Sequence, residues 1–114
     1  MDANLIIAIQ DSLWELGVTE NYIGYHYTSY AVYCSIEQPD CLLLVTKWLY
    51  PSIAKKYGTS SAAVERNIRT ILDIVWRKNK DSLEQIARHK LDQKPTATQF
   101  ISILAYGIKG KVIA

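Results

Sequence analysis

The sequence predicts an all-α fold: one compact domain, residues 1–114, of about six helices that include a helix-turn-helix. Three observations support this class. Apolar residues recur at helical spacing along most of the chain, whereas the alternation that strands require is scarce. Glycine, proline and capping residues divide these segments at short intervals. With 114 residues, of which 49% are hydrophobic, the chain can build one core.

The first two helices are predicted over residues 3–16 and 21–37. Gly17 ends the first, whose apolar stripe consists of Leu5, Ile6, Ile9, Leu13 and Leu16. Asn21 is the predicted N-cap of the second. The second helix is rich in tyrosine. We expect most of these rings at the rim of the core, and an aromatic partner-binding patch is the alternative; they are Tyr22, Tyr25, Tyr27, Tyr30 and Tyr33.

A third helix is predicted over residues 41–49, after the break at Pro39 and Asp40. Its dense apolar set predicts burial on most sides. A short helix follows over residues 51–57, with a proline in its first turn. The tryptophans are expected to be core residues; they are Trp14, Trp48 and Trp76.

The longest helix is predicted over residues 60–78, after a turn at Gly58. Thr59, Ser60 and Ser61 offer side-chain caps for its start. One face of it is apolar and should be buried; its members are Val64, Ile68, Ile71, Leu72 and Val75. A short helix over 81–89, capped by Asp81, comes next. The last helix begins after Pro95 and Thr96 and should end near Gly107 or Gly110.

A short helix, a glycine turn and a capped second helix have the layout of a helix-turn-helix. The second helix of that motif enters the major groove of DNA. Arg66 would pair with a guanine, Glu65 would accept from a cytosine amino group, and the lysines would neutralise phosphates. The alternative is a helical hairpin whose charged face is solvated and whose Glu65 and Arg69 form an i,i+4 pair. The local pattern leaves both interpretations open.

The charge distribution favours an anionic partner for the second part of the chain. Residues before Lys47 include six acids and no lysine or arginine, a balance of −6. All 13 basic residues lie from Lys47 onward against five acids, a balance of +8. Such a division is typical of proteins that bind a polyanion through one region.

The string "TKWLYPSIAKKYGTSSAAVERNIR" at 46–69 resembles the C-terminal effector domain of the stage-zero A sporulation transcription factors of spore-forming Firmicutes. The likeness extends to "LWELGV" at 13–18, "IGYHY" at 23–27, "VW" at 75–76 and "KPTATQFI" at 94–101. It covers roughly residues 5–108. It implies a six-helix fold that binds DNA through the helix starting near Ser60, in a bacterial protein of the cytoplasm and nucleoid.

The resemblance also assigns the site. Glu65 and Arg66 match the family's base-reading pair, and Lys47, Lys55 and Lys56 match as well. Three positions depart from the family: Ala62 stands where a DNA-contacting serine is typical, Ala63 where an arginine is, and Thr70 where a histidine is. The predicted base-reading residues are Ala62, Glu65, Arg66 and Arg69. The predicted phosphate-binding residues are Lys47, Lys55, Lys56, Ser60 and Ser61.

Double-stranded DNA is therefore the expected partner, with a second copy on tandem sites and RNA polymerase as further partners that the resemblance implies. The family carries a phosphoacceptor receiver domain, and this sequence contains none. Either a receiver has been removed or the protein is a stand-alone effector. Because Ala62 and Ala63 shorten contacts, a protein-interaction module that kept the fold and lost DNA affinity is the alternative function.

Other classes of function lack support in the sequence. We find no glycine-rich phosphate loop, no nucleophile elbow and no carboxylate pair in an apolar setting, so no enzyme, cofactor or small-molecule substrate is expected. His26 and His89 have no partners at metal-ligand spacing. Cys34 and Cys41 match no zinc or redox motif and are expected to be reduced. No run of 18 apolar residues predicts a membrane span, and no secretory signal is recognisable.

Overall fold

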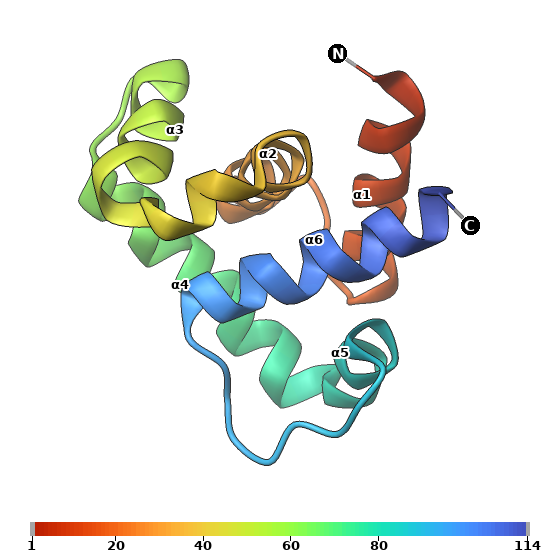
Figure 1. The fold of residues 1–114 in the computed structure, drawn as a ribbon. Helices are drawn as coiled ribbons and strands as arrows, with labels where there is room; N and C mark the ends of the chain where they lie inside the picture. The colour runs from red at the N-terminus through yellow and green to blue at the C-terminus, as the bar shows by residue number, and fades with distance from the viewer. Residues whose placement is uncertain (1, 114) are drawn as a thin grey trace.

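The computed structural model describes the backbone of residues 2–113 and the side chains of residues 2–112; the ends of the predicted domain, Met1 and Ala114, lie outside the described residues. The described chain forms six α-helices and no strand, so the predicted all-α class is confirmed. Figure 1 shows α1 (Ala3–Glu15), α2 (Ile23–Glu37), α3 (Tyr50–Tyr57), α4 (Ser61–Lys78), α5 (Lys80–Ala87) and α6 (Ala97–Ile113). A 3₁₀ helix, η1 (Pro39–Leu43), and a π-helical turn, η2 (Val45–Leu49), connect α2 to α3.

Helix α2 is the central element of the fold. It contacts α1, α3, α4 and α6, and in Figure 1 it lies in the upper middle of the molecule, above α6, and is seen nearly end-on. Its buried residues point in several directions; they are Gly24, Tyr25, Tyr27, Thr28, Ala31, Val32 and Ser35. Gly24 lies directly against α4, where a Cβ atom would meet the carbonyl oxygen of Asn67 at 2.4 Å and Ile71 Cγ1 at 2.6 Å. The backbones of α2 and α4 therefore approach at a distance that only glycine permits.

Helix α1 is fixed at both of its ends. Asp2 caps its start, because its Oδ1 accepts hydrogen bonds from the backbone N–H groups of Asn4 (3.0 Å) and Leu5 (3.2 Å). After the helix ends, Gly17 adopts a positive φ of 81°. Asn79, between α4 and α5, donates from Nδ2 to the carbonyl oxygen of Leu16 at 2.9 Å. This bond holds the end of α1 against the junction of α4 and α5.

Helix α6 extends past both glycines that were expected to end it, and it continues to Ile113. Gly107 lies inside the helix because α5 packs on it: a Cβ atom there would meet Ile86 Cγ2 at 2.5 Å and the Ile86 carbonyl oxygen at 2.7 Å. The glycine serves close helix packing and is not a stop. The start of α6 is capped reciprocally, with Gln99 N donating to Thr96 Oγ1 (3.1 Å) and Thr96 N to Gln99 Oε1 (2.9 Å).

The prediction of a mostly buried helix over 41–49 is wrong. The segment divides into η1 and η2, and only Cys41, Val45 and Leu49 are buried. These three are spaced four residues apart and reach the core. A run of consecutive apolar residues points to every side of a helical segment, and only one side faces the rest of the domain. Leu43 and Leu44 are therefore 82% and 51% exposed.

The core placement of two tryptophans is also wrong. Trp14 on α1 and Trp48 on η2 are 53% and 40% exposed. Each lies on an element whose inward positions are taken by aliphatic residues one position away, Leu13 and Leu49, both completely buried. Trp76 is partly buried against the core, and the Lys80 ammonium lies 4.7 Å from its ring centroid.

Two predicted N-caps are corrected. Helix α2 begins after Tyr22 instead of Asn21, and α5 begins after Asn79, so Asp81 lies inside its first turn. Neither start has a side-chain cap hydrogen bond. Asn79 does not cap α5 with its side chain, because that side chain is hydrogen-bonded to the end of α1.

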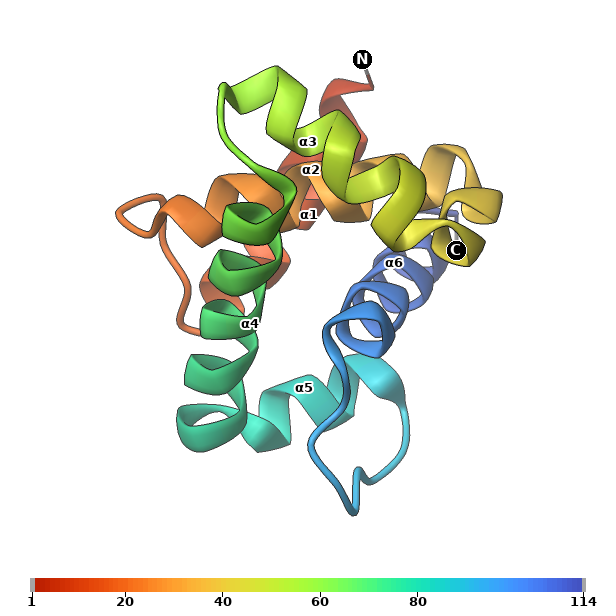
Figure 2. The same ribbon diagram turned by 90° about the vertical axis from the view of Figure 1, so that its left-hand side faces the viewer.

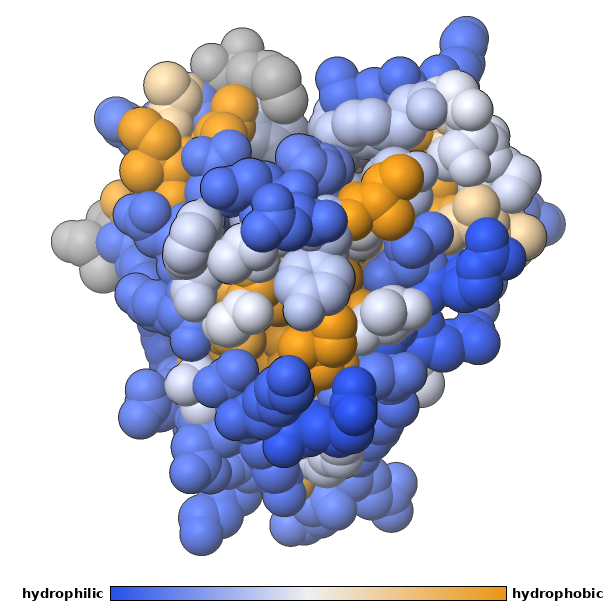
Figure 3. Space-filling model, turned by 180° about the vertical axis from the view of Figure 1, so that it is seen from behind, coloured by the Kyte–Doolittle hydropathy of each residue, from blue (hydrophilic) through white to orange (hydrophobic). Residues whose placement is uncertain are grey.

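Exposed apolar residues are dispersed on the face opposite that of Figure 1. Figure 3 shows hydrophilic residues over most of this face, with the hydrophobic colour divided into separate patches. Separate patches of this kind are normal on a protein surface. Within residues 2–113, none of the helices combines the length and the hydropathy that crossing a bilayer requires.

The contact at Gly24 gives a testable expectation for stability. In an open helix, replacing glycine by alanine stabilises by up to about 1 kcal/mol. Gly24→Ala should instead lower the free energy of unfolding by about 1–3 kcal/mol, because the new methyl group meets rigid backbone of α4. Urea denaturation followed by circular dichroism measures the difference.

Gly110→Ala is the matched control on α6. There the added methyl group meets only the mobile end of the Arg88 side chain, at 2.6 Å from Nη2. We expect a change between zero and a stabilisation of about 1 kcal/mol. A Gly24→Ala protein as stable as Gly110→Ala would show that α2 and α4 are not in backbone contact.

Candidate nucleic-acid interface

Helices α3 and α4 are joined by a turn that depends on glycine. Gly58 is in the left-handed region, with φ 66° and ψ 41°, and the Thr59 N–H donates to the Ala54 carbonyl oxygen at 2.9 Å. Ser60 is extended, with φ −102° and ψ 156°, and its Oγ accepts from the Ala63 N–H at 3.1 Å. Figure 2 shows α3 above and α4 running down one side of the molecule. The predicted helix, glycine turn and capped helix are confirmed.

The inner face of α4 is anchored in the core. Its five predicted apolar residues are all at most 1% exposed: Val64, Ile68, Ile71, Leu72 and Val75. On the flank that meets α2, Asn67 donates from Nδ2 to the Ala63 carbonyl oxygen at 2.7 Å. This packing fixes the rotation of α4 about its axis, and with it the direction in which the outer side chains point.

The outer face of α4 carries the predicted base-reading residues. Ala62, Arg66 and Arg69 are exposed, and Glu65 is partly exposed. Arg69 and Glu65 form the i,i+4 ion pair that the hairpin interpretation expected. An exposed pair of this kind contributes about 0.3–0.5 kcal/mol and does not by itself decide between the two interpretations. Arg66 has no side-chain hydrogen bond or ion pair within the described residues, so its guanidinium is available.

The predicted phosphate-binding residues gather around the turn, with one exception. Lys55 and Lys56 are exposed on the last turn of α3, where the helix dipole favours cations. Ser60 is exposed and Ser61 is half-buried at the start of α4. Lys47 is exposed on η2, before α3 begins, and stands apart from the turn.

A groove of about 320 Å³ beside the outer face of α4 was not predicted. It is lined by η2 and the start of α3, by Glu65 and Arg69 of α4, and by residues 94–98 before and within α6. Burial raises the pKa of Tyr50 in this groove, and the nearby Glu65 carboxylate raises it further. Lys94 crosses to α4 and forms an ion pair with Asp73. No local pattern marks Lys94, because its partner lies 21 residues earlier in the chain.

The arrangement offers hydrogen-bond donors and cations. Within the described residues, no three His, Cys, Asp or Glu side chains gather in a way that would hold a metal ion. What this surface can do is bind an anionic, hydrogen-bonding partner through Arg66 and the cations at the turn.

Comparison with known families agrees with this geometry. Residues 9–108 match the family model described as "Sporulation initiation factor Spo0A C terminal". The match runs from α1 into α6 and contains the whole of α3, the turn and α4. That domain is the DNA-binding effector domain of a sporulation transcription factor, and its family is not an enzyme family. This chain belongs to the family of Spo0A C-terminal domains.

Proposed function

We propose that this chain binds duplex DNA in a sequence-specific way, as a transcription regulator of the sporulation-initiation type, with α4 in the major groove. The observation that carries the proposal is the division of α4 into two faces. One face is buried, and the other presents Arg66 in its second turn, whose side chain has no hydrogen bond or ion pair within the described residues. A helix held in this way by a preceding short helix suits insertion into a groove about 12 Å wide.

Base reading is assigned to the exposed face. The Arg66 guanidinium can donate two hydrogen bonds to guanine O6 and N7, and the Glu65 carboxylate can accept from a cytosine amino group. Arg69 is also proposed to read bases, next to Glu65, with which it forms an ion pair. Its guanidinium has five N–H donors, so the bond to Glu65 leaves others for DNA. Ala62 offers only a methyl group, which suits contact with the methyl group of thymine.

Phosphate binding is assigned to the turn, the last residues of α3 and Lys47. Lys55 and Lys56 supply positive charge. Ser60 uses its oxygen to accept from Ala63, and its hydroxyl proton remains available to donate to a phosphate. The backbone N–H group of Ser61, at the start of α4, can also donate to a phosphate oxygen placed there.

Selection of bound sequences from random duplex DNA tests the function directly. Enrichment of one motif, followed by gel shifts whose affinity falls steeply with salt, is the expected result. Absence of enrichment, or binding that does not respond to salt, would instead favour the protein-interaction module that Ala62 and Ala63 suggest.

Arg66→Ala tests base reading. We expect specific binding to weaken by about 1–3 kcal/mol and the preference at one base pair to relax, because one bidentate contact is lost. Fluorescence anisotropy on the selected site and on single-base variants measures both effects. Arg77→Ala, at the other end of the same helix, should leave the base preference unchanged. An Arg66→Ala protein with wild-type selectivity would exclude Arg66 as a reader.

Lys55→Ala tests phosphate binding. We expect affinity to fall by a similar factor on every sequence, and the slope of log K against log salt to flatten by about 0.9. Titrations at four salt concentrations give the slope. Lys109→Ala is the control, because it removes the same charge from the last turns of α6, which end beside α1 in Figure 1, away from α3. Equal slopes for Lys55→Ala and wild type would exclude Lys55 as a phosphate contact, and equal slopes for Lys56→Ala as well would show that α3 faces away from DNA.

A further inference from the structure

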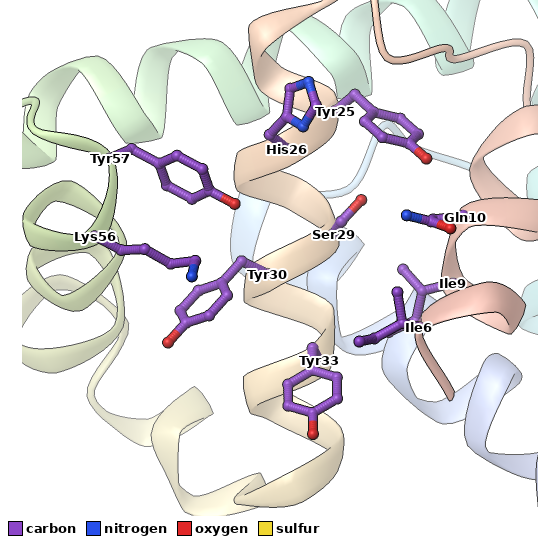
Figure 4. A pocket seen from close by; sticks show the side chains of 10 residues that line it. All are labelled: Ile6, Ile9, Gln10, Tyr25, His26, Ser29, Tyr30, Tyr33, Lys56 and Tyr57. Atoms are coloured by element: carbon purple, nitrogen blue, oxygen red, sulfur yellow. The ribbon is translucent and has the colours of Figure 1, made fainter. Parts of the chain in front are cut away.

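The side chain of Lys56 lies against two tyrosine rings. Its Nζ is 5.0 Å from the ring centroid of Tyr30 and 5.7 Å from that of Tyr57, both within the range of a cation–π contact. Figure 4 shows Lys56 and Tyr57 extending from α3 toward Tyr30, which belongs to α2. A cation therefore joins the first helix of the helix-turn-helix to the central helix of the fold.

The two rings are themselves held by aromatic packing. Tyr30 meets Tyr57 edge to face, with centroids 6.4 Å apart and an interplanar angle of 87°. Tyr57 also packs on Tyr27 at 5.3 Å, and Tyr27 is only 3% exposed. These three residues, which we call the tyrosine cluster, connect the position of Lys56 to the buried core.

The charge of Lys56 is not neutralised at this place. Within the described residues, no carboxylate forms an ion pair with it. Burial raises the pKa of Tyr30 and of Tyr57, and burial also raises the pKa of the nearby Cys34 thiol. These three groups therefore stay neutral near pH 7 and place no negative charge beside Lys56.

A positioned lysine is a better phosphate ligand than a free one. Lysine has a long side chain with many rotamers, and binding an anion restricts them. An ammonium that already rests on two rings has lost part of that freedom before DNA arrives, so less is lost on binding. The ring faces attract the cation and leave N–H groups free to donate to a phosphate oxygen.

We propose that Tyr30, together with Tyr57, is a positioning residue that holds Lys56 where it contacts the DNA backbone. This inference rests on the proposed DNA binding and deepens it. It also gives part of the tyrosine-rich α2 a role in DNA affinity, in place of a partner-binding patch. Tyr30 itself need not touch DNA.

A double-mutant cycle tests the proposal on the selected DNA site. Wild type, Tyr30→Leu, Lys56→Ala and the double variant are titrated at several salt concentrations. Tyr30→Leu should weaken binding about two- to fivefold, the range of an exposed cation–π contact. In the Lys56→Ala background, the same change should have no further effect. Tyr30→Phe keeps the ring and should bind as wild type does.

Tyr33→Leu is the matched control. Tyr30, Tyr33, Lys56 and Tyr57 line one hollow of about 230 Å³. Tyr33 is three residues further along α2 than Tyr30, but Lys56 lies over the rings of Tyr30 and Tyr57 and not over that of Tyr33. It should bind DNA as wild type does. Tyr30→Met serves if Tyr30→Leu does not fold, and thermal unfolding monitors every variant.

The outcomes separate the two levels of the proposal. Wild type that binds no selected sequence overturns the proposed function. Wild-type binding with unchanged affinity in Tyr30→Leu overturns only the positioning role. The same holds if Tyr30→Leu weakens binding equally with and without Lys56. Tighter binding by Tyr30→Leu also overturns it, because the cluster would then hold Lys56 away from DNA.

Discussion

The backbone contact between α2 and α4 at Gly24 is the constraint on which the domain depends. A helix can bury most of its circumference only if its neighbours come close, and α2 has neighbours in four directions. At Gly24 the nearest atom of α4 is the backbone carbonyl oxygen of Asn67, and the side chain of Ile71 lies beside it. This approach, together with the buried aliphatic stripe, fixes α4 in depth and in rotation. Everything that α4 exposes is therefore presented by a rigid support, which is what recognition of base edges requires.

The same helices also position the basic side chains at the end of α3 and on the outer face of α4. The lysines at the end of α3 and the arginine on the second turn of α4 belong to elements joined by one left-handed glycine and one capping serine. The glycine and the serine are single residues that act locally, yet together they set the angle between the two helices. Basic residues of the second part of the sequence form a positive surface because these elements are adjacent in space. Such a surface attracts polyanions at long range.

The sequence predicts those parts of the molecule that depend on local rules. The stripe of α4, the glycine turn and the serine cap follow from spacing and backbone preference, and all three are confirmed. The errors have tertiary causes. Local rules predict a helix end at Gly107, but this glycine lies inside α6 because Ile86 packs against it. Local rules also predict burial for the apolar run before α3, but only one side of it faces the core. Likewise, the ion pair of Lys94 and the contact of Lys56 with Tyr30 join residues distant in sequence, which no periodicity reveals.

The π-helical turn before α3 has a consequence for how this domain can change over evolution. Leu49 N donates to the Leu44 carbonyl oxygen at 3.2 Å, five residues back, and the chain then continues directly into α3. Such a turn accommodates one residue more than an α-helical turn would. Loss of that residue would rotate the preceding segment by about 100° relative to α3. Such a rotation would carry Cys41 and Val45 away from the core and would move Lys47 relative to α3, so the chain length is constrained at this turn even though Leu43 and Leu44 are exposed.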